Sequence, residues 1–236
     1  MARTLDDARR WTALGTSLVL RAAAGLDDTA YAEAAPLPGW SRAHVASHVA
    51  ANAEALSRLV HWAATGEPTP MYASPEERAA GIARGRAMPA AALTGWLRES
   101  AEALERGMDD LGERQWRTEV VTAQGRTVPA TEVPWMRARE VCVHAVDLAA
   151  GVSFADLPDD FLAALCDDVV AKRSAAGGPA VALRRPAGGA GWDLPGDGEA
   201  ALVTADLPAL AAYLTGRDAG PPAADGTPAP ALGPWL

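Results

Sequence analysis

The sequence predicts a helical bundle followed by a small α+β domain, and three observations carry this prediction. The first is a series of long amphipathic patterns with helical period before residue 177. The second is a change in composition: residues 1–177 hold 12 Gly and 9 Pro, whereas the 59 residues of 178–236 hold 10 Gly and 9 Pro. The third is a pair of short strand-like runs in this last part. We therefore expect a helical domain over 1–177 and an α+β domain over 178–236.

The helical domain is expected to contain four long helices and a fifth that closes it. They are predicted at residues 5–24, 41–64, 89–111, 134–151 and from 158 onward. In each stretch, apolar residues recur every three or four positions, which is typical of a helix with one buried face. Ser41 as N-cap, Pro89 in a first turn and Gly151 just past a last turn support these boundaries.

Two connections in the helical domain differ from ordinary short turns. Residues 66–88 contain Pro68, Pro70 and Pro75, so we expect a long connection, and long connections in compact domains are often functional. Residues 117–128 can form a short hairpin around Gln124 and Gly125.

The α+β domain is predicted from shorter signals. Residues 180–183 and 199–204 are apolar runs of strand length, and residues 207–215 form an apolar stretch closed by Gly216, which favours a short helix. We expect these elements to form a small domain packed on the bundle.

Composition excludes several classes of protein. The chain has 236 residues, of which 49% are hydrophobic, so disorder as the main state is excluded. Its formal net charge of −9 and the lack of a basic cluster argue against nucleic acid as a partner. No run of about 20 apolar residues and no apolar N-terminal leader are present, which predicts a cytoplasmic protein without a membrane span. Cys142 and Cys166 are expected to be buried, inert thiols.

Glu140 and His144 form the first candidate for chemistry. They lie four residues apart in a predicted helix, so both side chains project from one face and can converge on one metal ion. The face also carries Met136 and Val143, and a glutamate among apolar residues needs a partner. The alternative is a plain hydrogen bond between Glu140 and His144 without a metal. Asp147 either orients the imidazole of His144 or is solvated.

A histidine of the second helix can complete such a site. His48 lies closer to the centre of the apolar stripe than His44 does, so His48 is the better candidate for an inward ligand. We expect His44 at the flank and His61 at the surface or between helices. Two histidines and one glutamate would leave an open position on zinc, which can hold a thiol as thiolate or activate water. The residues alone do not choose between these two.

Three segments and the ending of the chain carry a resemblance to a known family. Residues 38–56 read PGWSRAHVASHVAANAEAL, residues 139–148 read REVCVHAVDL, residues 206–217 end in LTGR, and the chain ends in GPWL. The first three segments are similar, in this order, to the three signatures of the mycothiol-dependent maleylpyruvate isomerases, and the ending also fits. The sequence thus resembles this family over nearly its whole length.

The resemblance implies a fold, cofactors and site residues. The fold would be a DinB-like four-helix bundle followed by a small domain of sterol-carrier type. The cofactors would be zinc, held by His48, Glu140 and His144, and mycothiol, a cysteine-bearing pseudodisaccharide. Arg217 would assist catalysis or bind a carboxylate, although it can instead act as a cation at the end of a helix. The partners would be small molecules, and we expect a monomer or a small homo-oligomer.

The implied activity is isomerisation of maleylpyruvate or a similar cis-unsaturated diacid. Our hypothesis is that a thiolate adds to the cis double bond, the resulting single bond rotates, and elimination gives the trans isomer, fumarylpyruvate. A second hypothesis is a thiol S-transferase, in which the thiolate attacks an electrophile and stays attached. A third, from another class, is a small-molecule binding or regulatory module with a structural metal.

Overall fold

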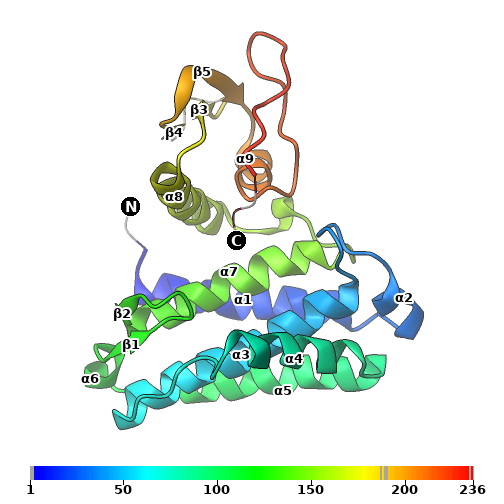
Figure 1. Cartoon of the computed structure of the whole chain (residues 1–236), viewed down its shortest axis with the longest axis vertical. Coiled ribbons are helices and arrows are strands. Elements are labelled where there is room, and N and C mark those ends of the chain that lie inside the picture. Colours follow the sequence, from blue (N-terminus) through cyan, green and yellow to red (C-terminus); the bar gives the residue numbers. More distant parts are fainter. Residues whose placement is uncertain (1–2, 187, 189–190, 234, 236) are drawn as a thin grey trace. The chain divides into compact units, whose positions relative to one another are not determined.

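A computed structural model of the chain describes residues 3–186, 188, 191–233 and 235. The chain folds into two compact units, one formed by Arg3–Val152 and one by Ser153–Leu236 (Figure 1). Pro234 and Leu236 of the GPWL ending lie outside the described residues. No helix within the described ranges is long and apolar enough to cross a membrane.

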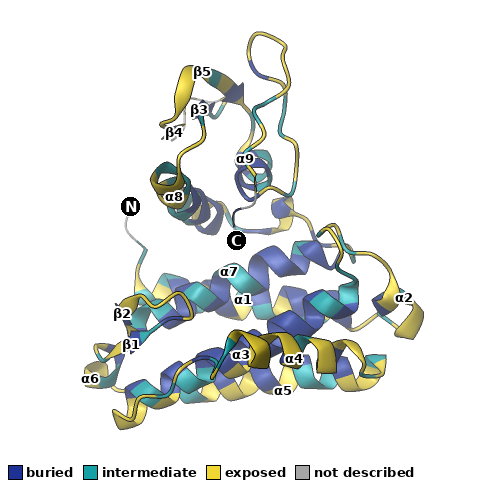
Figure 2. Cartoon of the chain, viewed as in Figure 1, coloured by how far each residue is buried: buried dark blue, intermediate teal, exposed yellow. Residues whose placement is uncertain are grey.

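Four long helices form the framework of the first unit, and they confirm four of the predicted segments. They are α1 (Leu5–Ala23), α3 (Arg42–Thr65), α5 (Ala90–Asp109) and α7 (Val133–Asp147). Helix α1 contacts α7 and α5, and α3 contacts the same two helices, so the four close into a ring around one core (Figure 1). Leucine, valine and alanine side chains from their inner faces fill this core. Figure 2 shows the buried positions of the four helices in dark blue.

Helix α3 is buried on more than one face because it is rich in alanine. Residues 45–53 are all buried, a run that includes Ser47, His48 and Asn52. Alanine has the highest helix propensity and lets neighbouring helices approach closely. The helix begins at Ser41, whose hydroxyl accepts from the N–H of His44, and Gly66 ends it in the left-handed conformation with φ of 80°. The polar side chains of α3 are therefore held inside the unit by a fixed helix.

The predicted long connection at 66–88 is wrong in part, because it contains the helix α4 (Pro75–Arg86), which packs on α3. Proline is compatible with the first turn of a helix, where its missing N–H has no partner to lose. Pro75 stands there, and the Ser74 hydroxyl accepts from the N–H of Glu77 as N-cap. Gly81 and Gly85 are the only buried residues of α4, so the helix approaches α3 through glycines and exposes its other faces (Figure 2).

Short elements complete the first unit. They are α2 (Asp28–Ala32), α6 (Glu113–Trp116), the strands β1 (Glu119–Val121) and β2 (Thr127–Pro129), and the 3-10 turn η1 (Ala130–Glu132). The strands pair antiparallel, with Val120 opposite Val128, which confirms the predicted hairpin.

The second unit combines two helices with a three-stranded sheet. Its elements are the 3-10 turn η2 (Phe154–Asp156), α8 (Asp159–Ala176), β3 (Pro179–Arg184), β4 (Trp192–Leu194), β5 (Asp197–Thr204) and α9 (Leu207–Leu214). The strand order is β4-β3-β5, with β3 antiparallel to β4 and parallel to β5. Helix α8 packs on α9 and β4. The helices from 158 and at 207–215 and the strands at 180–183 and 199–204 are thus confirmed, whereas β4 was not predicted.

The division between the units differs from the expected boundary at 177–178. Helix α8 belongs to the second unit, because its apolar residues face α9 and β4 and because the Trp192 indole N–H donates to Asp167 at 2.7 Å. The composition changes at Gly177, but that change marks the start of the sheet and not the start of the unit.

Candidate metal centre

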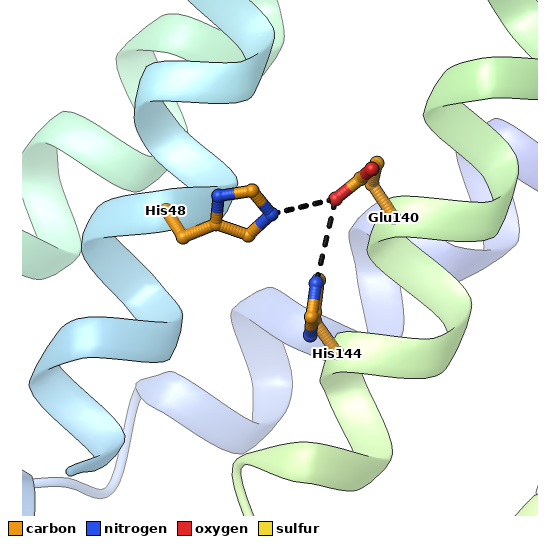
Figure 3. A group of neighbouring side chains, drawn as sticks. All are labelled: His48, Glu140 and His144. Carbon is orange, nitrogen blue, oxygen red and sulfur yellow. Dashed lines mark hydrogen bonds and ion pairs between the residues drawn. The ribbon is translucent and has the colours of Figure 1, made fainter. Parts of the chain in front are cut away.

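His48, Glu140 and His144 come together in the first unit as a group able to hold a metal ion. One ligand atom from each side chain lies within 4.8 Å of the other two. Nε2 of His48 donates to Oε2 of Glu140 at 2.8 Å, and Nε2 of His144 lies 3.4 Å from the same oxygen (Figure 3). The two imidazole rings face each other edge to face, with centroids 4.9 Å apart. The three residues singled out in the sequence therefore form one cluster.

Helix geometry explains why they meet. Glu140 and His144 stand one turn apart on α7, so their side chains project from the same face. His48 stands on α3, which packs against that face of α7. His48 and His144 are buried, and the Glu140 side chain is 20% exposed. The cluster thus lies between two core helices and keeps limited access to solvent.

Asp147 orients His144 through the ring nitrogen that points away from the cluster. The Nδ1 atom of His144 donates to Oδ2 of Asp147 at 2.7 Å, and Asp147 is fully buried. Because Nδ1 holds a proton for this bond, the lone pair of the neutral ring is on Nε2, which points to the cluster. Of the two alternatives considered for Asp147, the structure supports the orienting one.

The electrostatics of the metal-free cluster are dominated by Glu140. Burial alone would raise the pKa of this carboxyl, but His48 and His144 lower it well below its ordinary value. Burial lowers the pKa of His48, with partial opposition from Glu140. Burial also acts to lower the pKa of His144, but the hydrogen bonds with Asp147 and Glu140 outweigh it and raise that pKa to about 9. The carboxylate is therefore charged and shared by two imidazoles.

The donor set fits zinc in type and spacing. Imidazole nitrogen and carboxylate oxygen bind zinc at about 2.0–2.2 Å, so two ligands of a tetrahedral ion are about 3.3–3.6 Å apart. The distance of 3.4 Å from Glu140 Oε2 to His144 lies in this range, and the distance of 2.8 Å to His48 is shorter, so a bound ion requires these two side chains to separate slightly. Three protein ligands would leave a further coordination position.

Several neighbours of the cluster were not foreseen as part of it. The indole of Trp40 packs edge to face on His48 with ring centroids 5.6 Å apart. Arg78 on α4 places Nη2 3.5 Å from His48 Nδ1. Arg137 on α7 is 1% exposed and donates through Nη1 to the main-chain oxygen of Val49 at 2.7 Å. Arg137 had a signal in the sequence, since it stands three residues before Glu140 and so shares its face of the helix.

The other candidate residues lie elsewhere. His44 is half-buried at the start of α3, and His61 is exposed near its end. Cys142 and Cys166 are buried as expected, and burial raises the pKa of both thiols, that of Cys166 to about 12. Arg217 belongs to the second unit, where it is half-buried and donates through Nη1 to the main-chain oxygen of Thr215 at 2.8 Å.

The chain is similar in sequence and fold to proteins of one known family. The family model of the mycothiol maleylpyruvate isomerase N-terminal domain matches residues 12–149. The crystal structure of a mycothiol-dependent maleylpyruvate isomerase is similar over 97% of this chain and 96% of its own, with 37% identity and a TM-score of 0.90. A His-to-Ala mutant of such an isomerase is similar to the same extent, with a TM-score of 0.91. No curated protein sequence matches the chain significantly. The chain therefore belongs to the mycothiol maleylpyruvate isomerase family.

Proposed function

We propose that this protein is a zinc- and mycothiol-dependent isomerase that converts maleylpyruvate, or a similar cis-unsaturated diacid, to its trans isomer. The observation that carries the proposal is the cluster of His48, Glu140 and His144, present in a chain that is 37% identical to a mycothiol-dependent maleylpyruvate isomerase over nearly its whole length. A small-molecule substrate and a low-molecular-weight thiol follow from this assignment as the partners.

The positions of the residues support the roles proposed for them. His48, Glu140 and His144 would hold zinc, which when bound lowers the pKa of a thiol and so supplies the nucleophile for reversible addition to the double bond. Asp147 keeps the lone pair of neutral His144 on Nε2. Glu140 would contribute a negative charge that partly neutralises a bound dication. Its Oε2 atom also lies close to both imidazoles. The indole of Trp40 packs against the His48 ring, with the ring centroids 5.6 Å apart.

Arg217 is proposed to bind a substrate carboxylate, for which a guanidinium offers two parallel donors. This role comes from the similarity of the LTGR motif to the third family signature. We also propose that the first unit is of the DinB-like class and the second of the sterol-carrier type. The cytoplasmic location expected from the sequence stays a prediction.

Incubation of the purified protein with zinc, mycothiol and maleylpyruvate tests the proposal. We expect NMR to show the trans product and a thiol assay to show that free mycothiol is not consumed. Stoichiometric loss of thiol would instead identify an S-transferase. Zinc content provides the second test: His48→Ala should lose the metal, whereas His61→Ala, a change at an exposed histidine of the same helix, should retain it. Equal zinc in both variants would refute the ligand set.

A further inference from the structure

Arg78 is a cation beside the candidate metal centre that the proposed function does not use. It stands on the face of α4 that approaches α3, because the buried Gly81 and Gly85 follow it by three and seven residues. The two glycines let α4 come close to α3, and Nη2 of Arg78 lies 3.5 Å from Nδ1 of His48. The guanidinium is thus held next to a ring of the cluster, although Arg78 is exposed to solvent.

Arg78 forms no ion pair with an acidic side chain among the residues that the structure describes. The acid next to it on α4, Glu77, pairs with Arg58 at 3.0 Å. Another neighbour of Arg78 is Tyr72: burial raises the pKa of this hydroxyl, and Arg78 opposes the shift through its charge and a hydrogen bond. A guanidinium has five N–H groups, so those that do not bond His48 or Tyr72 are available to another acceptor.

The contact between Arg78 and His48 depends on which ring nitrogen carries the proton. In the metal-free protein, Nε2 of His48 donates to Oε2 of Glu140, so Nδ1 presents its lone pair and accepts from Arg78. Figure 3 shows Nε2 directed at Glu140 and Nδ1 directed away from it. A metal ion takes the lone pair of Nε2, and the proton of the neutral ring is then on Nδ1. Because guanidinium nitrogens only donate, the contact with Arg78 is lost when the centre is loaded.

The two histidines of the centre differ in the group that meets Nδ1. His144 donates from Nδ1 to Asp147, which is the kind of acceptor that a ligating imidazole usually has. At Nδ1 of His48, the described hydrogen bonds include only the one from Arg78, which cannot accept. The loaded centre therefore presents two donors on this side, the Nδ1–H of His48 and the guanidinium of Arg78, and both need an acceptor.

We propose that Arg78 binds a carboxylate of the diacid substrate when the centre holds its metal. A carboxylate accepts charge-assisted hydrogen bonds from the guanidinium, and it has a second oxygen for the Nδ1–H of His48. The identity of the diacid rests on the proposed function, whereas the need for an anionic acceptor follows from the change at Nδ1 of His48. Arg78 would thus select acids over neutral molecules and would not itself hold the metal.

Calorimetric titration of the zinc-loaded protein with maleate tests the proposal, and the diamide of maleic acid is the neutral control. We expect maleate to bind and the diamide to show no detectable binding. Arg78→Gln should weaken maleate binding roughly tenfold, as expected for the loss of one charged hydrogen-bonded partner. Arg84→Gln is the matched control and should leave the affinity unchanged, since Arg84 is another exposed arginine of α4. Equal maleate affinities in the two variants would overturn the proposal.

The metal provides a second readout that needs no turnover. Because loading removes the acceptor of Arg78, the wild type should bind maleate more tightly with zinc than without it, and this difference should be smaller in Arg78→Gln. Arg78→Gln should also bind zinc at least as tightly as the wild type, since no contact at Nδ1 then competes with loading. A wild-type affinity for maleate that does not depend on zinc would contradict the proposal. Loss of zinc from Arg78→Gln would contradict it too, because Arg78 would then support the ligand His48.

Kinetics separate this proposal from the proposed function. In the isomerase reaction, Arg78→Gln should raise KM for the diacid roughly tenfold, and Arg84→Gln should not change it. If the wild type forms no trans product, the proposed function fails, and the maleate titrations still decide whether Arg78 binds a carboxylate. If the trans product forms but KM and maleate affinity are the same in both variants, the role of Arg78 is refuted and the proposed function stands.

Discussion

Arg137 on α7 bonds the main chain of α3 next to a proposed zinc ligand: its Nη1 donates to the oxygen of Val49, 2.7 Å away. The same nitrogen donates to Oδ1 of Asn52 at 3.0 Å. Nε and Nη2 of Arg137 are buried and have no hydrogen-bond partner among the described residues. Burial lowers the pKa of Arg137 to about 10, although Glu140 opposes this shift. Such an incompletely paired charge contributes little to stability, so its value lies in fixing α3 against α7.

Replacement of Arg137 by methionine should therefore weaken zinc binding more than it weakens the fold. We expect zinc affinity to fall on the order of tenfold, because His48 loses its fixed position relative to Glu140. The free energy of unfolding should change by less than about 2 kcal/mol, since lost hydrogen bonds and relief of a buried charge offset each other. Competition with a chromophoric chelator and thermal unfolding measure the two quantities.

Arg139→Met is the matched control for Arg137. Arg139 stands on the same helix, and its guanidinium lies over the ring of Trp135, 5.7 Å from the centroid. We expect normal zinc affinity in this variant. Equal losses of zinc affinity in the two variants would show that Arg137 has no specific positioning role.

Zinc affinity should rise with pH up to about 9. The pKa of His144 in the metal-free protein is raised to about 9, so at pH 7 zinc must displace a proton from this ring. The pKa values of His48 and Glu140 are lowered, so neither releases a proton above pH 7. We expect release of about one proton per zinc and roughly tenfold tighter binding per pH unit between pH 7 and 9. Calorimetry in buffers of different ionisation enthalpy measures the proton.

The variant Asp147→Asn tests the cause of the raised pKa of His144. Without the negative partner of Nδ1, the pKa of His144 should fall and the number of protons released at pH 7.5 should decrease. Zinc affinity should also drop by about 10–100-fold. In the metal-free wild type, the raised pKa of His144 stabilises the fold below its unfolded-state pKa of about 6.5, and this contribution is lost as the pH rises through about 9. Unchanged proton release in the variant would contradict the assignment.

The protein's own thiols should not take part in the reaction. Cys142 and Cys166 are both fully buried, and burial raises the pKa of each thiol far above neutrality. We expect no reaction of the native protein with a disulfide reagent at pH 8, and reaction of two thiols after denaturation in guanidinium. The Cys142→Ala and Cys166→Ala variants should keep turnover with mycothiol. Rapid labelling of a native cysteine would show that the core opens at that site.

Gly85 is expected to tolerate no side chain, because α4 approaches α3 closely there. A Cβ at this position would lie 2.5 Å from the Trp96 ring and 2.6 Å from the hydroxyl of Ser47. Gly85→Ala should destabilise the protein by about 1–3 kcal/mol despite the better helix propensity of alanine. Gly95→Ala is the control, since its Cβ would meet nothing within 4 Å, and it should stabilise by about 0.5–1 kcal/mol. Chemical denaturation compares the two.

Arg217→Ala should lower turnover while zinc content and melting temperature stay close to those of the wild type. The reason is the proposed pairing of its guanidinium with a substrate carboxylate. Its contact with the main-chain oxygen of Thr215 makes a structural contribution that the melting temperature would reveal. A large loss of stability with normal turnover would refute the catalytic role.

The proximity of His48, Glu140 and His144 could be predicted from their spacing in the sequence. Glu140 and His144 are joined by helix geometry alone, and His48 lies toward the apolar stripe of its own helix. Spacing also places Arg137 and Asp147 near this face of the helix, but it does not give their partners. Those depend on how each side chain turns toward His144 of the same helix, in the case of Asp147, or toward groups of α3, in the case of Arg137. Helix α4 was not predicted because Pro75 reads as a helix breaker unless the cap at Ser74 is recognised. The boundary between the units was predicted at residue 177 and lies after Val152. Helix α8 has the same amphipathic sequence pattern as the helices before it, and only its contacts with α9 and β4 assign it to the second unit.

The shared carboxylate of Glu140 has a consequence for the protein when no metal is bound. Oε2 contacts both imidazoles directly, so the three side chains stay gathered by mutual attraction when no cation joins them. The apoprotein should accordingly survive treatment with a chelator as a folded molecule and recover full occupancy on simple addition of the ion. Loading then requires a proton to leave and a few side chains to rotate, without any rebuilding of the helices around them.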